Sequence, residues 1–395
     1  MIKYARRVVL FFCGALFGIS ISIAGREVPH HSYYGFPLLA DVIDSIERFY
    51  VTPLTREELI EAAIQGIFQK LDGYSEFLDA EDVAKQDENN QGQYKGFGFE
   101  VNGTEHGLAV INVFAGSPAQ KAGIELGDTI THLSKQVISL DNQETILKQI
   151  KTAANDNQPI DVNVKDTKGK QWQLNIKPNV IHVAAIESKV LENNLGYIRI
   201  NGFQSSTFDS IKTQLISWRQ QQLNGLIIDL RRNPGGLFEQ AVKVADLFIS
   251  KGTIVSTKGR FKQANSDYSA TDINLLKDVP MLVLIDKNSA SAAEVLAAAL
   301  QQNQRAILMG ERSYGKGSIQ GMIPTIFQDS RVKLTIAHYL TPKGDNIHQS
   351  GITPDINLPS MTGNASNNAP IINDTQADSD DNALKSAISW FKTDT

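Results

Sequence analysis

The sequence predicts a multidomain α/β protein, and three observations support this prediction. Between Asn194 and about Pro359, short runs of β-branched and aliphatic residues alternate with segments of helical periodicity. A stretch from about residue 96 to residue 180 contains short strands separated by turn residues. Before it, residues 37–78 carry apolar side chains at helical spacing. With 395 residues, the chain is long enough for two or three domains that each bury a core.

The composition excludes several classes of function. Hydrophobic residues make up 42% of the chain and charged residues 21%, as in ordinary globular proteins. The net charge of −5 comes without a clustered basic surface, so we expect no nucleic acid among the partners. The one cysteine, Cys13, leaves the rest of the chain without a disulfide framework or a thiolate zinc site.

Residues 1–24 have the pattern of an export signal. Three basic residues precede an apolar run over residues 8–24, which ends in the small-residue cleavage pattern Ser22-Ile23-Ala24. The run is at the short end of what spans a bilayer, so the segment is either a signal peptide or a membrane anchor. We therefore expect an exported protein in the periplasm, held at the inner membrane if residues 8–24 are retained.

Residues 25–92 are expected to form a helical amino-terminal region followed by a linker. Two amphipathic helices are predicted between Pro37 and Leu78, because apolar residues recur three and four positions apart. Residues 81–94 are polar and charged, and we interpret them as the linker.

Residues 93–183 are expected to form a separate domain. Its predicted strands lie at 97–101, 108–113, 160–164 and 171–176. The domain resembles a PDZ domain in its Gly96-Phe97-Gly98-Phe99 loop and in the Pro-Ala-x-x-Ala-Gly-Ile-x-x-Gly-Asp pattern that starts at Pro118. In such a domain, the backbone N–H groups of Gly96, Phe97, Gly98 and Phe99 would bind a peptide's terminal carboxylate. A dinucleotide-binding loop is excluded because Val101 stands where the third glycine is needed.

Residues 184–360 are expected to form the α/β core. Its predicted strands lie at 195–200, 226–230, 281–285, 306–309 and 332–337, and its predicted helices at 207–221, 237–250 and 291–302. Residues 361–395 are rich in Asn, Asp, Ser and Thr and predict a disordered polar tail, with one short amphipathic helix near Leu384 to Phe391.

The candidate catalytic residues lie between Asn288 and Gln320. Ser291 is at the predicted start of a helix, where free backbone N–H groups and the positive end of the dipole favour negative charge. Lys316 lies between two glycines, which permit close approach of the backbone. If the segment is extended, the even spacing places Gln320 on the same face as Lys316. A serine, a lysine whose pKa is depressed by burial, and backbone donors together support amide hydrolysis.

This segment closely resembles the active-site region of the carboxy-terminal processing proteases, also called tail-specific proteases. The resemblance extends over nearly the whole chain after the export signal, and it implies a core of the crotonase and Clp-protease-like type. It implies Ser291 as the nucleophile in preference to Ser289 and Ser313, Lys316 as the base, and Gln320 as the residue that holds the lysine amine in position.

The resemblance also implies an oxyanion hole. Its donors would be the backbone N–H of Ala292 and that of either Gly235 or Gly236 in the Pro-Gly-Gly turn. The sequence does not decide between the two glycines.

Three positions depart from the family pattern: Gly73 replaces a proline, Arg232 an asparagine and Ala293 a serine. We expect catalysis to survive all three, since none of them is the nucleophile or the base. His338 lies in an alternating strand and is interpreted as a packed side chain rather than a catalytic one. Because no ligand cluster with metal spacing occurs in the sequence, we expect a site that uses neither a metal nor a cofactor.

The sequence thus predicts an exported serine endopeptidase that recognises carboxy-terminal tails through a PDZ domain. The expected partners are proteins with exposed tails, and an activating adaptor protein is a further candidate. We also expect the PDZ domain to block or misalign the Ser-Lys pair until a tail binds. The alternative is a catalytically silent PDZ scaffold that binds protein carboxy termini. A crotonase-like acyl-CoA enzyme is disfavoured, because an exported protein does not meet coenzyme A.

Overall fold

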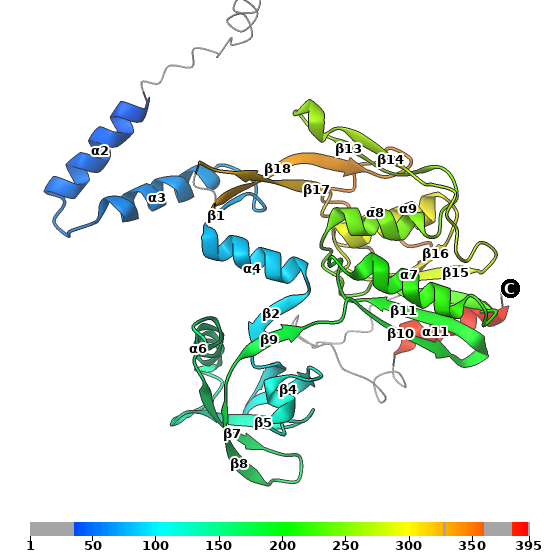
Figure 1. Cartoon of the computed structure of the whole chain (residues 1–395), viewed down its shortest axis with the longest axis horizontal. Coiled ribbons are helices and arrows are strands. Elements are labelled where there is room, and N and C mark those ends of the chain that lie inside the picture. The colour runs from blue at the N-terminus through cyan, green and yellow to red at the C-terminus, as the bar shows by residue number, and fades with distance from the viewer. Residues whose placement is uncertain (1–34, 327–328, 359–380, 394–395) are drawn as a thin grey trace, which may run out of the picture. The chain divides into compact units, whose positions relative to one another are not determined.

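The computed structural model describes residues 35–326, 329–358 and 381–393 (Figure 1). The predicted signal peptide or anchor, residues 1–24, lies outside the described residues. The chain divides into two units, Met1–Leu71 and Asp72–Thr395. No helix within the described ranges is long and apolar enough to cross a membrane.

The first unit contains two consecutive helices, α2 (Gly35–Phe49) and α3 (Arg56–Phe68). A capping box starts α3: the Thr55 hydroxyl accepts from the Glu58 N–H at 3.2 Å, and the Glu58 carboxylate accepts from the Thr55 N–H at 2.7 Å. Ile43 is the only buried residue of these two helices. The amphipathic pattern therefore predicts these helices, but it does not produce a buried core within them.

A helix replaces the linker that we expected at residues 81–94. Helix α4 (Ala80–Asn90) begins after Asp79, whose carboxylate accepts a hydrogen bond from the Asp82 N–H at 2.8 Å. Acidic residues in its first turn are stabilised by the helix dipole. The linker prediction is wrong because it relied on apolar periodicity, which this sequence lacks. The helix buries only Val83 and depends instead on its cap.

Residues 93–182 form an antiparallel β structure. The main sheet has the order β3 (Phe99–Thr104), β4 (Gly107–Val113), β5 (Thr129–Leu133), β7 (Ile160–Lys165) and β8 (Gln171–Ile176), and β6 (Gln136–Val137) pairs with β5. Strands β2 (Gln93–Gly96) and β9 (Asn179–His182) form a separate ribbon. The helices of this part are α5 (Pro118–Lys121) and α6 (Gln143–Asn155), and α6 contributes Ile146, Ile150 and Ala154 to its core.

A six-stranded sheet forms the centre of the remaining chain. Its order is β10 (Ile186–Leu191), β11 (Leu195–Ile200), β12 (Gly225–Asp229), β15 (Met281–Ile285), β16 (Ile307–Gly310) and β19 (Ile356–Asn357), and it is parallel from β11 to β19. The strands predicted at 195–200 and 281–285 are found at those residues. The loops after β12, β15 and β16 therefore leave the same edge, where α/β sheets commonly bind ligands.

Both faces of this sheet are covered. Alternate strand residues such as Ile198 and Val283 pack with α7 (Thr207–Trp218), α8 (Phe238–Asp246) and α9 (Ala292–Gln302) in the largest apolar cluster. Their neighbours Tyr197 and Leu282 belong to a second cluster with α11 (Asn382–Thr393). Because side chains alternate along a strand, the central strands β11, β12, β15 and β16 each contribute to both clusters.

The end of the chain corrects the prediction of a disordered tail over residues 361–395. Residues 361–380 lie outside the described residues, but α11 buries Leu384, Ala387 and Phe391 against the central sheet. The prediction is wrong for this part because the apolar face of a short amphipathic helix has a sheet face to cover. The helix expected near Leu384 to Phe391 is present.

A second sheet includes the strand that follows Lys316 in the chain. Its order is β1 (Glu76–Leu78), β18 (Arg331–Leu340), β13 (Thr253–Lys258) and β14 (Ser266–Ser269), with β17 (Ser318–Pro324) also paired to β18. Strand β17 begins two residues after Lys316. The position of the lysine therefore depends on how β17 and β18 are anchored.

Candidate active site

Ser291 occupies a strained turn between β15 and α9. Its backbone has φ 55° and ψ −116°, a conformation that side-chain-bearing residues rarely adopt. Ala292 is the first residue of α9, so its N–H has no intrahelical partner. A strained serine on a strand-to-helix turn resembles the nucleophile elbow of hydrolases, in which the next residue supplies an oxyanion donor.

The neighbouring serines are engaged elsewhere. The Ser289 hydroxyl donates to the Leu230 carbonyl at 2.8 Å and is buried. The Ser313 hydroxyl donates to the Glu294 carboxylate at 2.5 Å and accepts from the Ile352 N–H at 2.6 Å. Ser291, in contrast, is only partly buried. The geometry therefore favours Ser291 over both neighbours as a nucleophile.

The loop that carries Lys316 requires its glycines. A Cβ on Gly315, which has φ 92°, would lie 2.9 Å from the Gly351 nitrogen, and a Cβ on Gly317 would lie 2.6 Å from the His348 nitrogen. Burial lowers the pKa of Lys316 below its ordinary value, and the charge of Lys333 lowers it further. A lowered pKa is the shift that a lysine needs to act as a base.

Glu294 ties the serine turn to the lysine loop. One carboxylate oxygen accepts from the backbone N–H groups of Ser291 and Lys316, both at 2.8 Å. The other accepts from the Gly315 N–H at 2.7 Å and from the Ser313 hydroxyl at 2.5 Å. Glu294 is fully buried. A single side chain thus fixes the backbones of both candidate catalytic residues.

Tyr339 also connects the serine turn to the lysine loop, through backbone carbonyls in place of N–H groups. Its hydroxyl faces the backbone carbonyls of Ser291, at 3.1 Å, and of Lys316. Burial raises the pKa of Tyr339 well above its ordinary value, so the phenol keeps its proton and donates. Glu294 therefore accepts from the N–H groups of the two residues, while the single hydroxyl proton of Tyr339 lies between their carbonyls.

The structure does not bring Gln320 to Lys316 in the way the sequence predicts. The Gln320 amide nitrogen donates to the hydroxyls of Ser318 and Thr335, both at 3.1 Å. No hydrogen bond joins Gln320 to Lys316 in the described part of the chain. The β17–β18 register shifts between Ile319, which lies opposite Ala337, and Gln320, which lies opposite Thr335, so that the Gln320 amide meets the threonine hydroxyl.

The Pro-Gly-Gly turn lies directly against Ser291. A Cβ on Gly235 would lie 2.8 Å from Ser291 Cβ and 3.0 Å from the Ala292 nitrogen, so only glycine fits. The Gly235 N–H donates to the Asn233 side chain at 2.8 Å. Of the two glycines, Gly236 is the one whose N–H has no hydrogen-bond partner within the described residues. Ala292 and Gly236 therefore have the available donors.

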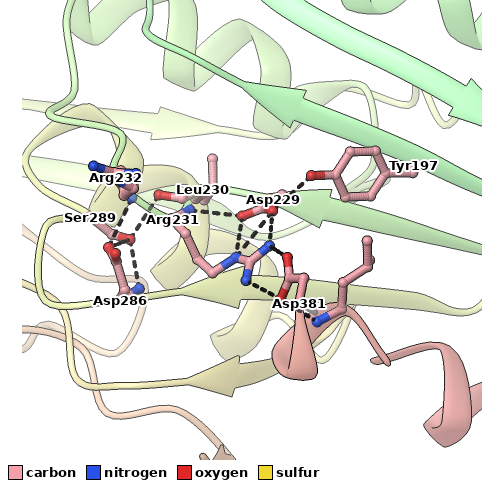
Figure 2. Close-up of polar contacts among 9 residues, drawn as sticks. Tyr197, Asp229, Leu230, Arg231, Arg232, Asp286, Ser289 and Asp381 are labelled. Atoms are coloured by element: carbon pink, nitrogen blue, oxygen red, sulfur yellow. Dashed lines mark hydrogen bonds and ion pairs between the residues drawn. The ribbon is translucent and has the colours of Figure 1, made fainter. Parts of the chain in front are cut away.

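A partly buried network of ion pairs and hydrogen bonds surrounds Arg231, which precedes this turn in the chain (Figure 2). Asp229 accepts from the Tyr197 hydroxyl at 2.8 Å and from Arg231 Nη2 at 2.5 Å, and Arg231 also makes two bonds to Asp381, at 2.7 and 2.8 Å. Burial alone would lower the pKa of Arg231, but the two carboxylates outweigh it and raise that pKa. The segment before α11 thus contacts Arg231, in the loop that leads into the turn.

The structure shows the surroundings of two of the three positions that depart from the family pattern, Arg232 and Ala293. Arg232 has φ 61°, and its N–H donates to the Asp286 carboxylate at 2.9 Å. Asparagine adopts this left-handed conformation more readily than arginine does. Ala293 is fully buried in the first turn of α9, and its methyl group packs in the apolar cluster.

The loop Gly96-Phe97-Gly98-Phe99 borders a cavity of about 560 Å³ between β3 and α6. Gly96, Phe97 and Phe99 line it, together with Leu147, Ile150 and Ala154 of α6 and residues of α4. Gly98 has φ 85° and its carbonyl accepts from the Ser117 hydroxyl at 3.1 Å. The loop is therefore next to a cavity whose wall combines apolar side chains with the lysines Lys85, Lys95 and Lys151 and the acidic residues Asp82 and Glu88.

Sequence reasoning missed Glu294 and Tyr339 as parts of the site. Ser291-Ala-Ala-Glu294 fits the capping-box pattern, which would have indicated one of the four hydrogen bonds of Glu294. No local signal indicates Tyr339. Among the described residues, no group of three or more His, Cys, Asp or Glu side chains is arranged to hold a metal ion.

Comparison with known proteins gives consistent matches. Residues 194–358 match the model of Peptidase family S41. The chain is 33% identical over 359 residues to a carboxy-terminal-processing protease of Bartonella bacilliformis, covering 89% of this chain and 82% of that one. It is 30% identical over 353 residues to carboxy-terminal processing protease CtpA of Bacillus subtilis, covering 89% and 74%. The solved photosystem II D1 C-terminal processing protease has the same fold, with a TM-score of 0.52 and 24% identity over 81% of this chain and 92% of that chain.

Proposed function

The chain belongs to the S41 family of carboxy-terminal processing proteases, which are serine-type peptidases, and on this premise we propose that it is an endopeptidase with a Ser291–Lys316 catalytic pair. Its substrates are proteins with exposed carboxy-terminal tails. The observation that carries this proposal is the clamp formed by Glu294 and Tyr339, which joins the strained serine turn to a lysine of lowered pKa.

In the proposed mechanism, neutral Lys316 takes the proton of the Ser291 hydroxyl while Oγ attacks the substrate carbonyl. The N–H groups of Ala292 and Gly236 stabilise the oxyanion. Protonated Lys316 then gives its proton to the leaving amine, which leaves an ester on Ser291. Lys316 next deprotonates a water molecule, and hydrolysis of the ester restores the serine hydroxyl and releases the new carboxyl terminus.

One rearrangement must precede the first step. Across the described residues, no hydrogen bond joins Lys316 Nζ to Ser291 Oγ, whereas the backbones of both residues are fixed. The rearrangement therefore takes place in the lysine side chain, whose four-carbon stem is flexible. Gln320 is a further candidate for holding the amine once it has turned towards the serine.

Tail recognition is proposed for the domain at residues 93–183, which we interpret as a PDZ domain. The cavity beside Gly96, Phe97, Gly98 and Phe99 supports this interpretation, because a tail added as a strand along β3 would place its last side chain among apolar residues of α6. Lys95 and Lys151 in the cavity wall suit a terminal carboxylate, whereas Asp82 and Glu88 of α4 would repel one that came close to them. We further propose that this domain restrains the catalytic pair until a tail binds.

We also propose that the protein acts outside the cytoplasm, in the periplasm, on the strength of the sequence pattern of residues 1–24. Retention of residues 8–24 would anchor it to the inner membrane. An activating adaptor protein stays a candidate partner, for which the exposed apolar side chains of α2 and α3, such as Phe49, offer a surface.

The test is cleavage of an unfolded reporter protein with an apolar carboxy-terminal tail, with product masses as the readout. We expect wild-type protein to cut it, and Ser291→Ala and Lys316→Met each to lower kcat by at least about 10³-fold. Lys287→Met, which changes an exposed lysine near the site, is the matched control and should retain activity. A folded Lys316→Met variant with the wild-type rate would refute the Ser-Lys pair. Tail binding without cleavage by the wild type would favour the scaffold alternative.

A further inference from the structure

Lys316 has a specific aromatic neighbour that the proposed mechanism does not use. Its Nζ lies 4.7 Å from the centroid of the Tyr74 ring, over the ring face. At this distance a lysine ammonium group is attracted to the ring by a cation–π interaction. Tyr74 comes from the segment before β1, far from Lys316 in sequence, and only partly exposes its side chain.

The segment that carries Tyr74 is firmly attached to the sheet beside Lys316. The Asp72 carboxylate accepts from the Tyr74 N–H at 2.8 Å, and the Ser75 hydroxyl accepts from the Thr335 N–H of β18 at 3.0 Å. Strand β1 pairs with β18, and Lys333 Nζ donates to Glu76 at 2.8 Å. The ring is therefore a fixed feature of the lysine's surroundings and not a loose surface group.

We infer that Tyr74 is a positioning residue for Lys316: its ring holds the ammonium end of the lysine in a resting position, from which the side chain must turn to reach Ser291. This inference rests on the proposed function. A ring favours the charged lysine over the neutral one, whereas catalysis needs the neutral amine. The contact therefore restrains the enzyme before substrate binds, and displacing it contributes to activation.

Other charged and titratable groups act on the same place and must be held constant in a test. Asp72, Glu76 and Lys333 act on Lys316, and Glu294 and Tyr314 act on Tyr74. The His348 ring lies edge-on to Tyr74 at 6.5 Å, and the His338 ring lies 5.1 Å from His348. Substitutions confined to Tyr74 leave all of these groups in place, so differences between variants report on the ring.

The experiment compares Tyr74→Leu with Tyr74→Phe. Leucine keeps an apolar wall but removes the π face, and phenylalanine keeps the face and removes only the hydroxyl. In a Ser291→Ala background, the pH dependence of acetic anhydride labelling at Lys316, followed by mass spectrometry, measures its pKa directly. We expect Tyr74→Leu to lower that pKa by roughly half to one unit and Tyr74→Phe to leave it near the wild-type value.

With Ser291 present, the acidic limb of the plot of kcat/KM against pH should move to lower pH in Tyr74→Leu. At pH values on this limb, kcat/KM of Tyr74→Leu should be roughly threefold or more above the wild-type value. A pKa of Lys316 that stays unchanged or rises in Tyr74→Leu overturns the inference, as does an equal shift in Tyr74→Phe. Thermal unfolding checks folding, and Tyr74→Met replaces leucine if that variant unfolds. Full activity of Lys316→Met would instead refute the proposed function, while the labelling result would still report on Tyr74.

Discussion

Replacing Glu294 by glutamine should weaken both the fold and catalysis. The carboxylate accepts four hydrogen bonds, two on each oxygen. In the amide, one oxygen keeps the bonds from Ser291 and Lys316, but the NH₂ group then faces the Gly315 N–H, a donor against a donor. A lost bond to a charged acceptor and a buried unsatisfied donor each cost about 1–3 kcal/mol. We therefore expect the free energy of unfolding to fall by about 3 kcal/mol.

The effect on catalysis follows from the same geometry. Glu294 fixes the backbones of the proposed nucleophile and the proposed base relative to each other, and a misplacement of about 1 Å at a catalytic group can cost roughly 10²-fold in rate. Urea unfolding gives the stability of Glu294→Gln, and reporter cleavage well below its melting temperature gives kcat. Glu105→Gln, in an exposed turn, is the matched control and should stay within about 0.5 kcal/mol of wild type.

A Glu294→Gln variant with wild-type kcat would refute the view that this side chain aligns the pair. If stability also stayed within about 0.5 kcal/mol of wild type, the four-bond arrangement itself would be wrong. A loss of stability with full activity at low temperature would mean that Tyr339 alone keeps the two backbones aligned.

Two further predictions concern the turn beside Ser291. Asp381→Asn should lower the free energy of unfolding by about 1–2 kcal/mol, because Arg231 loses the charge of one carboxylate partner and one of its two acceptor oxygens there. Burial alone raises the pKa of Asp381, but its bonds to Arg231 lower that pKa overall. The contribution of Asp381 to the free energy of unfolding is therefore present above the unfolded pKa near 3.8 and is lost as pH falls through the lower folded pKa. Acid titration of stability should therefore be flatter for Asp381→Asn, and parallel curves would contradict the pairing. Arg232→Asn should leave stability unchanged or raise it by up to about 1 kcal/mol, because asparagine tolerates φ 61°, and a loss above about 1 kcal/mol in urea unfolding would show that the arginine side chain matters more than its backbone.

The sequence by itself determined much of the local structure around the nucleophile. A buried strand, a small-residue turn and an alanine-rich helix place Ser291 at a helix start, because these features depend on neighbours along the chain. The glycines around Lys316 and in the Pro-Gly-Gly turn indicate close backbone approach for the same reason. The α/β core and the short helix near Leu384 follow from apolar periodicity alone.

Only the tertiary structure decided how these pieces meet. The strand register places Gln320 opposite Thr335, whose hydroxyl accepts from the Gln320 amide, and spacing along the chain does not reveal this partner. Asp381 reaches Arg231 across 150 residues of sequence, because an apolar helix face covers the sheet beside it. A polar composition concealed α4, whose stability comes from a cap and the helix dipole more than from an apolar stripe.

The same distinction applies to the catalytic pair. The residue types of the proposed pair follow from the motif, whereas the contacts that fix its backbones come from Glu294 and Tyr339, and the aromatic neighbour of its lysine is Tyr74. Backbone sterics and dipoles act within a few residues and so can be predicted from sequence. Hydrogen bonds and ring contacts between distant segments exist only once strand order and register have fixed which side chains face each other. In this chain, these contacts form where loops from the two sheets meet at one edge of the central sheet.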